Sequence, residues 1–200
     1  MTDETPTRRP WALAILLIIA GSIGWFAAFM LTVEKFQLLT NPAAELGCDF
    51  SLLVQCRANL ESWQGSLFGF PNPIIGLAGW VAPVVVGAAL LAGARFNRWF
   101  WILFNIGVVG ALALVIWLIS QSVFVLGTLC PWCMVTWSVT IPVFWAVTLR
   151  NFSSGVFGVP PRARRFFTSA YGWVPALTIV SYIVVALVAQ AGLDILNYIF

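Results

Sequence analysis

Four long stretches of the chain contain no charged residue, and the charges gather between them. The stretches cover residues 10–33, 62–94, 99–149 and 166–193. A helix needs about 20 apolar residues to cross a bilayer, because each residue adds about 1.5 Å along the axis. The first and last stretches therefore each hold one crossing, and the second holds one crossing behind a short lead-in.

The third stretch is too long for a single crossing. Its 51 residues would form a helix of roughly 75 Å, so the stretch must fold back on itself. Gly127 and Thr128, followed by Pro131 as a helix starter, predict the place of the turn. The pattern thus indicates an all-α integral membrane protein with five transmembrane helices. Their expected ranges are about 11–32, 73–93, 99–121, 130–149 and 171–191.

The composition supports this fold class. The chain has 200 residues, of which 61% are hydrophobic and 8% are charged. In a soluble domain about a quarter of the residues are charged. We expect residues 1–200 to form a single membrane domain in contact with lipid. The net charge is only +3, and nucleic acid is not expected among the partners.

The basic residues predict the orientation of the helices. With the N-terminus in the cytoplasm, eight of the ten lysine and arginine residues fall on the cytoplasmic side, as the positive-inside rule requires. The C-terminus then lies on the outer side. An arginine pair before an apolar run also fits a signal peptide, but the run continues to Val33 and favours a retained helix. The eight residues are Arg8, Arg9, Arg95, Arg98, Arg150, Arg162, Arg164 and Arg165.

Residues 34–72 form a sizeable polar segment on the outer side. The segment runs into LESWQGSLFGFPNPIIG, whose aromatic residues favour the headgroup level but are too few to span the bilayer. We expect this segment to cap the bundle with a short interfacial helix. Residues 151–165 are basic and rich in Gly, Ser and Pro, and are expected to form a cytoplasmic connector.

All four cysteines fall on the outer side, where disulfides persist. Cys48 and Cys56 belong to the outer segment, and Cys130 and Cys133 to the outer end of the fourth helix. Pro131 suits the first helical position, so we expect Cys130 to cap the helix and Cys133 to lie in its first turn. The free N–H groups and the dipole at that helix end stabilise a thiolate.

Trp137 follows Cys133 by four residues and therefore lies on the same helix face. Two thiols and an indole on one face suit a flat, apolar, redox-active molecule that enters from the lipid. The chain contains no histidine, which excludes an imidazole base and a histidine ligand to haem or zinc. No charged residue lies in the middle of a predicted span, which argues against an ion-coupled transporter.

Two other interpretations of the cysteines exist. Four cysteines could form a tetrathiolate zinc site, but seven residues between Cys48 and Cys56 is not a usual zinc spacing, and no metal is expected. The pairs could also be structural disulfides, and this alternative stays open for Cys48 and Cys56. A C-x-x-C pair at a helix start is typically exchangeable instead.

The chain resembles the vitamin K epoxide reductase family, and its bacterial members most closely. The resemblance is carried by the spaced cysteine pair in the first outer loop, by Asn72 in FPNPIIG and by CPWC at the fourth helix. It extends from the first helix through the fifth. It implies four helices around a quinone, either menaquinone or ubiquinone, in the bacterial plasma (inner) membrane.

The resemblance also implies a role for each cysteine. Cys130 and Cys133 match the active-site pair of the family, with Cys133 nearest the quinone. Cys48 and Cys56 match a shuttle pair. In that pair Cys48 meets the partner protein, and Cys56 exchanges with Cys130.

Three further residues match quinone-binding positions or replace them. Asn72 matches an asparagine that hydrogen-bonds a quinone carbonyl, and Ser62 matches a hydroxyl residue of the capping segment. From the residues alone, Asn72 between two prolines is a turn residue and Ser62 a helix cap. Animal members carry a tyrosine where this chain has Trp137. An indole cannot act as a phenol, so quinone reduction is expected rather than epoxide reduction.

The resulting hypothesis is a membrane thiol:quinone oxidoreductase. It is expected to reoxidise a secreted or membrane-anchored thioredoxin-like oxidase, a separate protein because this chain ends at Phe200 without the fused domain of many bacterial members. The disulfide bond protein B family catalyses the same reaction, but there the C-x-x-C pair comes first and the wide pair later. A non-enzymatic membrane protein with structural disulfides or a metal site is the alternative from another class.

Overall fold

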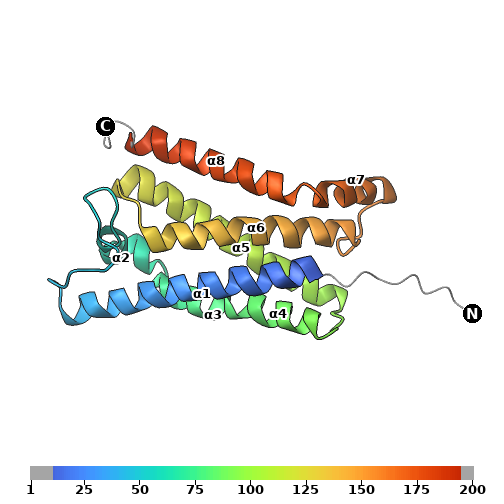
Figure 1. Ribbon diagram of the computed structural model, residues 1–200, viewed down its shortest axis with the longest axis horizontal. Coiled ribbons are helices and arrows are strands. Elements are labelled where there is room, and N and C mark those ends of the chain that lie inside the picture. The colour runs from blue at the N-terminus through green and yellow to red at the C-terminus, as the bar shows by residue number, and fades with distance from the viewer. Residues whose placement is uncertain (1–10, 195–200) are drawn as a thin grey trace, which may run out of the picture.

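The computed structural model describes residues 11–194, and the predicted cytoplasmic Arg8 and Arg9 lie outside this range. The described chain is helical, and its long helices lie side by side (Figure 1). In chain order the elements are α1 (Trp11–Thr40), α2 (Arg57–Glu61), the short 3₁₀ helix η1 (Trp63–Ser66), α3 (Asn72–Gly79), α4 (Val81–Leu91), α5 (Arg98–Gln121), the π-helical turn η2 (Ser122–Leu126), α6 (Pro131–Ser153), α7 (Pro161–Tyr171) and α8 (Val174–Leu193).

Five helical segments of the described chain are long and apolar enough to cross a membrane, which confirms the predicted number. Gly127 ends the third segment with a φ of 67°, a left-handed conformation that glycine adopts without strain. The chain reverses there, as the sequence predicted. The five segments are Trp11–Thr40, Asn72–Leu91, Arg98–Leu126, Pro131–Ser153 and Val174–Leu193.

The first helix is longer than the sequence suggested. α1 continues to Thr40, so the first residues of the predicted polar segment 34–72 are helical. Leu31, Glu34 and Leu38 are all buried, and their spacing keeps one helix face against the protein. The helix ends just before Asn41-Pro42, because a residue that precedes proline disfavours the helical conformation.

The second crossing is divided into α3 and α4 at Trp80. Pro83 explains the break, since its ring lacks an N–H and clashes with the carbonyl four residues earlier, at Gly79. The Trp80 ring packs against α1 at Gly24, where a Cβ atom would lie 2.3 Å from it. A small residue at this position therefore lets the two helices approach closely.

Four crossings form the bundle, and the fifth lies outside it. α6 packs against α1 and α5, and α8 lies along the outer side of α6 (Figure 1). Residues 151–165 were predicted to be a connector, but α7 begins within them at Pro161. Its Phe167 ring stacks on Phe152 at a centroid distance of 4.4 Å. The helix was missed because prolines and arginines dominate its first turn.

The polar segment covers one end of the bundle, here called the capped end. It contains two short elements, α2 and η1, where a single interfacial helix was expected. Ser62 separates them with an extended backbone, and its hydroxyl accepts a hydrogen bond from the Gly65 N–H at 3.2 Å. The capped end also holds the start of α6, while α7 lies at the opposite end (Figure 1).

Candidate active site

The candidate site lies where two segments far apart in the sequence pair at the capped end. Val54 forms a parallel β-bridge with Leu129. The backbone N–H groups of Gln55 and Leu129 donate across this bridge at 3.0 and 2.7 Å. Cys130 directly follows Leu129 of the bridge, and Cys56 lies two residues after Val54. The bridge therefore brings the two cysteine pairs together.

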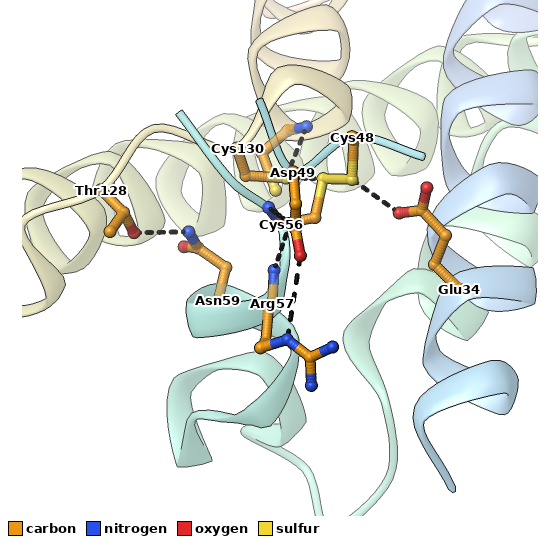
Figure 2. The surroundings of a disulfide bond; sticks show 9 residues. Glu34, Cys48, Asp49, Cys56, Arg57, Asn59, Thr128 and Cys130 are labelled. Carbon is orange, nitrogen blue, oxygen red and sulfur yellow. Dashed lines mark hydrogen bonds and ion pairs between the residues drawn. A yellow bond between two sulfur atoms is a disulfide. The ribbon is translucent and has the colours of Figure 1, made fainter. Parts of the chain in front are cut away.

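The cysteines form a chain of sulfur atoms that leads into the protein. Cys48 and Cys56 form a disulfide, and Cys130 and Cys133 are free thiols. The Sγ atoms of Cys130 and Cys56 lie 3.5 Å apart (Figure 2). A disulfide bond is about 2.05 Å long, so a shift of about 1.5 Å would let these sulfurs bond. Cys48 is 2% exposed, so its sulfur is closed to a second protein unless the loop that carries it moves.

Asp49 and Arg57 hold the loop that carries this disulfide. Asp49 Oδ1 accepts hydrogen bonds from the backbone N–H groups of Cys56 (2.8 Å) and Arg57 (3.2 Å) at the start of α2 (Figure 2). Arg57 Nη1 donates to the Pro42 carbonyl at 2.8 Å. Phe50 and Leu52 extend from the same loop and are 73% and 81% exposed. An exposed apolar tip therefore flanks the buried disulfide.

The helix start organises the C-x-x-C pair as predicted. Pro131 is the first residue of α6, and Cys130 is its cap. The Cys133 N–H donates to the Cys130 sulfur at 3.3 Å, so a free donor of the first turn points at this thiol. Cys130 is fully buried below the cap, whereas Cys133 is partly exposed. The second thiol therefore faces open space.

That space is a cavity of about 810 Å³ with largely apolar walls. The walls come from α1, α3, α4, α5, α6 and the cap, so α8 lies outside the pocket. Cys133 and Trp137 line it from α6, and Ser62 and Asn72 line it from the cap and the start of α3. Cys133 is thus placed between Cys130 on one side and the cavity on the other.

The two polar residues predicted to bind a quinone also hold the cap together. Ser62 Oγ donates to the Asn59 carbonyl at 2.8 Å while it caps η1. Asn72 Nδ2 donates to the Gln64 carbonyl at 2.7 Å, and its Oδ1 accepts from the Leu67 N–H at 3.1 Å. Asn72 keeps one N–H for a ligand, and Ser62 has already used its hydroxyl hydrogen.

The sequence missed a third polar residue at the cavity. Gln64 lies in η1, lines the cavity and is 3% exposed. Its Nε2 donates to Gln121 Oε1 at 3.3 Å, and its Oε1 has no hydrogen-bond partner among the described residues. A buried amide with an unmet hydrogen-bonding atom suits a polar ligand group. Trp137 closes the wall as a buried ring packed among aliphatic residues.

A carboxyl group was also missed. Glu34 of α1 is 3% exposed, and its Oε2 lies 2.8 Å from the Cys48 sulfur (Figure 2). Ligand atoms of Glu34, Cys48 and Cys56 lie within 4.8 Å of one another, close enough to share a metal ion. The disulfide removes the thiolate charges that a metal would need, so a four-thiolate site does not form in this redox state.

Comparison with known proteins agrees with this geometry. Residues 15–148 match the model of the family described as "Vitamin K epoxide reductase family", a range that includes all four cysteines. Searches among curated proteins and among solved structures gave no match. The matched range covers the cap and all but the ends of the four bundle crossings, and it leaves out α8. The chain therefore belongs to the vitamin K epoxide reductase family.

Proposed function

We propose that this protein passes two electrons from a thioredoxin-like dithiol protein to a quinone and so supports disulfide formation outside the cytoplasm. Family membership gives the coarser conclusion, a multi-pass membrane oxidoreductase that acts on thiols or disulfides. One observation carries the finer proposal. The four sulfurs are arranged in sequence from the cap to a large apolar cavity.

The proposed exchange begins at the cap. A donor thiolate attacks Cys48, which forms a mixed disulfide and releases Cys56 as a thiolate. Cys56 attacks the Cys130–Cys133 disulfide at Cys130, the sulfur that it faces at 3.5 Å, and Cys133 leaves as a thiolate. The second donor thiol resolves the mixed disulfide and frees Cys48. Cys48 then attacks Cys56, which restores the Cys48–Cys56 disulfide and frees Cys130.

At this stage Cys130 and Cys133 are both reduced, as they are in the structure. A quinone in the cavity accepts two electrons and two protons and leaves as the quinol, while the Cys130–Cys133 disulfide re-forms. Cys133 is the thiol that lines the cavity, so we assign it the contact with the acceptor. The apolar walls suit a lipid-soluble ring and exclude water from the exchange.

The polar groups around the cavity fit an acceptor with carbonyl groups. Asn72 and Gln64 each keep one amide hydrogen that can be donated to a quinone carbonyl. The unmet Oε1 of Gln64 can accept the O–H group of the quinol. We therefore propose both as quinone ligands, with Trp137 as an apolar wall. Trp137 supplies no phenol to protonate an epoxide, and quinone reduction is the proposed activity.

We further propose that the capped end faces the outside of a bacterial plasma membrane. Arg95, Arg98 and Arg150 adjoin the helix ends opposite the cap, which agrees with the positive-inside rule. The exposed Phe50 and Leu52 offer an apolar contact for a thioredoxin-like partner beside the disulfide.

The experiment uses the purified protein in liposomes with a reduced thioredoxin-like donor. Ubiquinone and menaquinone are compared as acceptors, and each cysteine is replaced in turn by alanine. We expect donor-dependent quinol formation with at least one quinone and its loss in all four variants. A wild-type protein whose thiols do not react with donor and quinone would refute the proposed function.

A further inference from the structure

A buried carboxyl group touches the shuttle disulfide without a part in the exchange described above. Glu34 Oε2 lies 2.8 Å from Cys48 Sγ (Figure 2), and the side chain is almost fully enclosed. The ion pairs of the described chain join Arg57 to Asp49 and Glu61, and Glu34 belongs to neither. The Trp132 side chain of α6 also hydrogen-bonds the carboxyl group but brings no positive charge. A buried carboxylate without a cation is strongly unfavourable, so this group needs a proton or a second donor close by.

The sulfur atom explains how the carboxyl group is satisfied in both redox states. A disulfide sulfur carries no hydrogen, so with the disulfide formed the proton of this contact belongs to Glu34. When Cys48 is reduced, its S–H group can donate to the Glu34 carboxylate at the same site. One proton thus suffices for the pair, and its position depends on the redox state of Cys48.

We propose that Glu34 is the catalytic acid–base residue of Cys48. In the forward exchange Glu34 takes the proton of the Cys48 thiol. The resulting thiolate attacks Cys56, the Cys48–Cys56 bond forms, the Cys56–Cys130 bond breaks, and Cys130 leaves as a thiolate. When the second donor thiol resolves the mixed disulfide, Glu34 returns the proton to the Cys48 thiolate as it leaves. The inference rests on the thiol–disulfide exchange of the proposed function and does not depend on the quinone.

The surroundings explain why a built-in proton carrier is needed. The sulfurs of Cys48, Cys56 and Cys130 are buried in a cluster with four leucines, so bulk water does not reach Cys48 readily. The leucines are Leu31, Leu38, Leu46 and Leu60. Without water, a thiolate that forms or leaves there depends on a protein group for its proton.

The other charged and titratable groups near Glu34 have other partners and do not contact the Cys48 sulfur. Asp49 of the cap accepts backbone N–H groups at the start of α2 and faces Arg57. Lys35, the neighbour on α1, donates to the Leu60 carbonyl at 2.6 Å. Cys133 of α6 packs against the same cluster but opens to the cavity. Glu34 is the group in contact with the Cys48 sulfur.

The test measures how fast dithiothreitol releases Cys48 as a free thiol from its mixed disulfide, in the purified full chain without quinone. Alkylation and mass spectrometry follow Cys48 at pH 6 and at pH 9. The variant Glu34→Gln keeps the shape of the side chain but cannot exchange the proton. Glu45→Gln, an exposed carboxylate of the same segment, is the matched control. Rates are expressed relative to wild type at each pH, so ionisation of the reductant cancels.

We expect Glu34→Gln to be slower than wild type by about 10²-fold at pH 6, the lower end of typical acid–base contributions. At pH 9 the ratio should fall to within about threefold, because a free cysteine thiol ionises near pH 8.5 without help. Glu45→Gln should match wild type at both pH values. A Glu34→Gln rate equal to that of the control, or a defect that does not change with pH, would overturn the proposal.

The quinone-free design separates this inference from the proposed function. If wild-type protein reduces no quinone but the pH-dependent defect is present, the proposed function fails and the role of Glu34 stands. If quinone turnover is normal and the defect is absent, the role of Glu34 fails alone.

Discussion

The polar residues at the two ends of α6 lie in opposite surroundings. At the far end Asn151 is fully buried, and its Nδ2 donates to the Trp101 carbonyl at 3.2 Å and to Asn105 Oδ1 at 3.1 Å. The Arg150 guanidinium lies 3.7 Å from the centre of the Trp101 ring. At the capped end Cys133 faces a cavity. The two asparagines at the far end are packed and hydrogen-bonded, whereas the capped end keeps space and reactive groups.

The difference shows where a bundle of apolar helices can hold a reactive site. A hydrogen-bonded amide pair between α5 and α6 fixes the two helices to each other. Such a buried polar contact makes the fold rigid when all of its hydrogen-bonding groups have partners. Reactivity needs the reverse, namely free thiols, room for a second molecule and an unmet polar atom. The cap supplies the closure that the helices leave open, because it covers Cys130 but leaves Cys133 at the cavity.

The largest expected effect comes from Cys130→Ser at the reactive end. Serine is a good helix cap, so the start of α6 and the packing are retained while the thiol is lost. We expect donor-dependent quinone reduction to fall by at least about 10³-fold, as for other losses of an essential nucleophile. A stopped-flow assay of quinol formation measures this rate.

The same variant has an internal control. The donor should still reduce the Cys48–Cys56 disulfide in Cys130→Ser, which alkylation with mass spectrometry detects. Turnover within about tenfold of wild type would show that Cys56 does not need Cys130, and the proposed order of the sulfurs would be wrong.

The next effect tests the packed end. Asn151→Ala leaves the Asn105 carbonyl oxygen and the Trp101 carbonyl without their donor, which should lower the free energy of unfolding by about 2–3 kcal/mol. Thermal unfolding in detergent reports it as a lower Tm. Quinone reduction per folded molecule should stay at the wild-type level. A loss of specific activity without a loss of stability would mean that the far end takes part in the chemistry.

The smallest expected effect tests the proposed contact between Gln64 and the quinone. Gln64→Leu keeps the side-chain volume but removes the amide, so KM for the quinone should rise by roughly three- to tenfold, the value of one net hydrogen bond. The rate at which a donor reduces Cys48–Cys56 should not change. Gln37→Leu, an exposed glutamine on α1, is the control. An unchanged KM in Gln64→Leu would remove Gln64 from the binding site.

The sequence predicts the helices well because lipid imposes a long, simple pattern. Runs without charge predicted the five crossings, Gly127 predicted the turn, and Pro131 predicted that Cys130 caps α6. The early end assigned to α1 shows the limit of the method. The charge of Glu34 predicts the edge of the membrane. In the structure Glu34 is buried, and its helix continues to Thr40.

The candidate site is less predictable, because contacts between distant segments create it. The Val54–Leu129 bridge places Cys56 beside Cys130, and no local spacing contains that information. Gln64 lies in a polar segment where a glutamine is unremarkable by itself. Its importance follows from burial against the cavity, which only the packed cap reveals.

The most direct test of the central claim is the stoichiometry of electron transfer in Cys133→Ala and wild-type protein. Reduced donor and quinone are mixed with protein in liposomes, and quinol and oxidised donor are counted in the same sample. The account predicts one quinol for each donor dithiol oxidised by wild type, and no quinol from Cys133→Ala while its Cys48–Cys56 disulfide still exchanges with the donor. Quinol formation by Cys133→Ala at the wild-type rate would contradict the account.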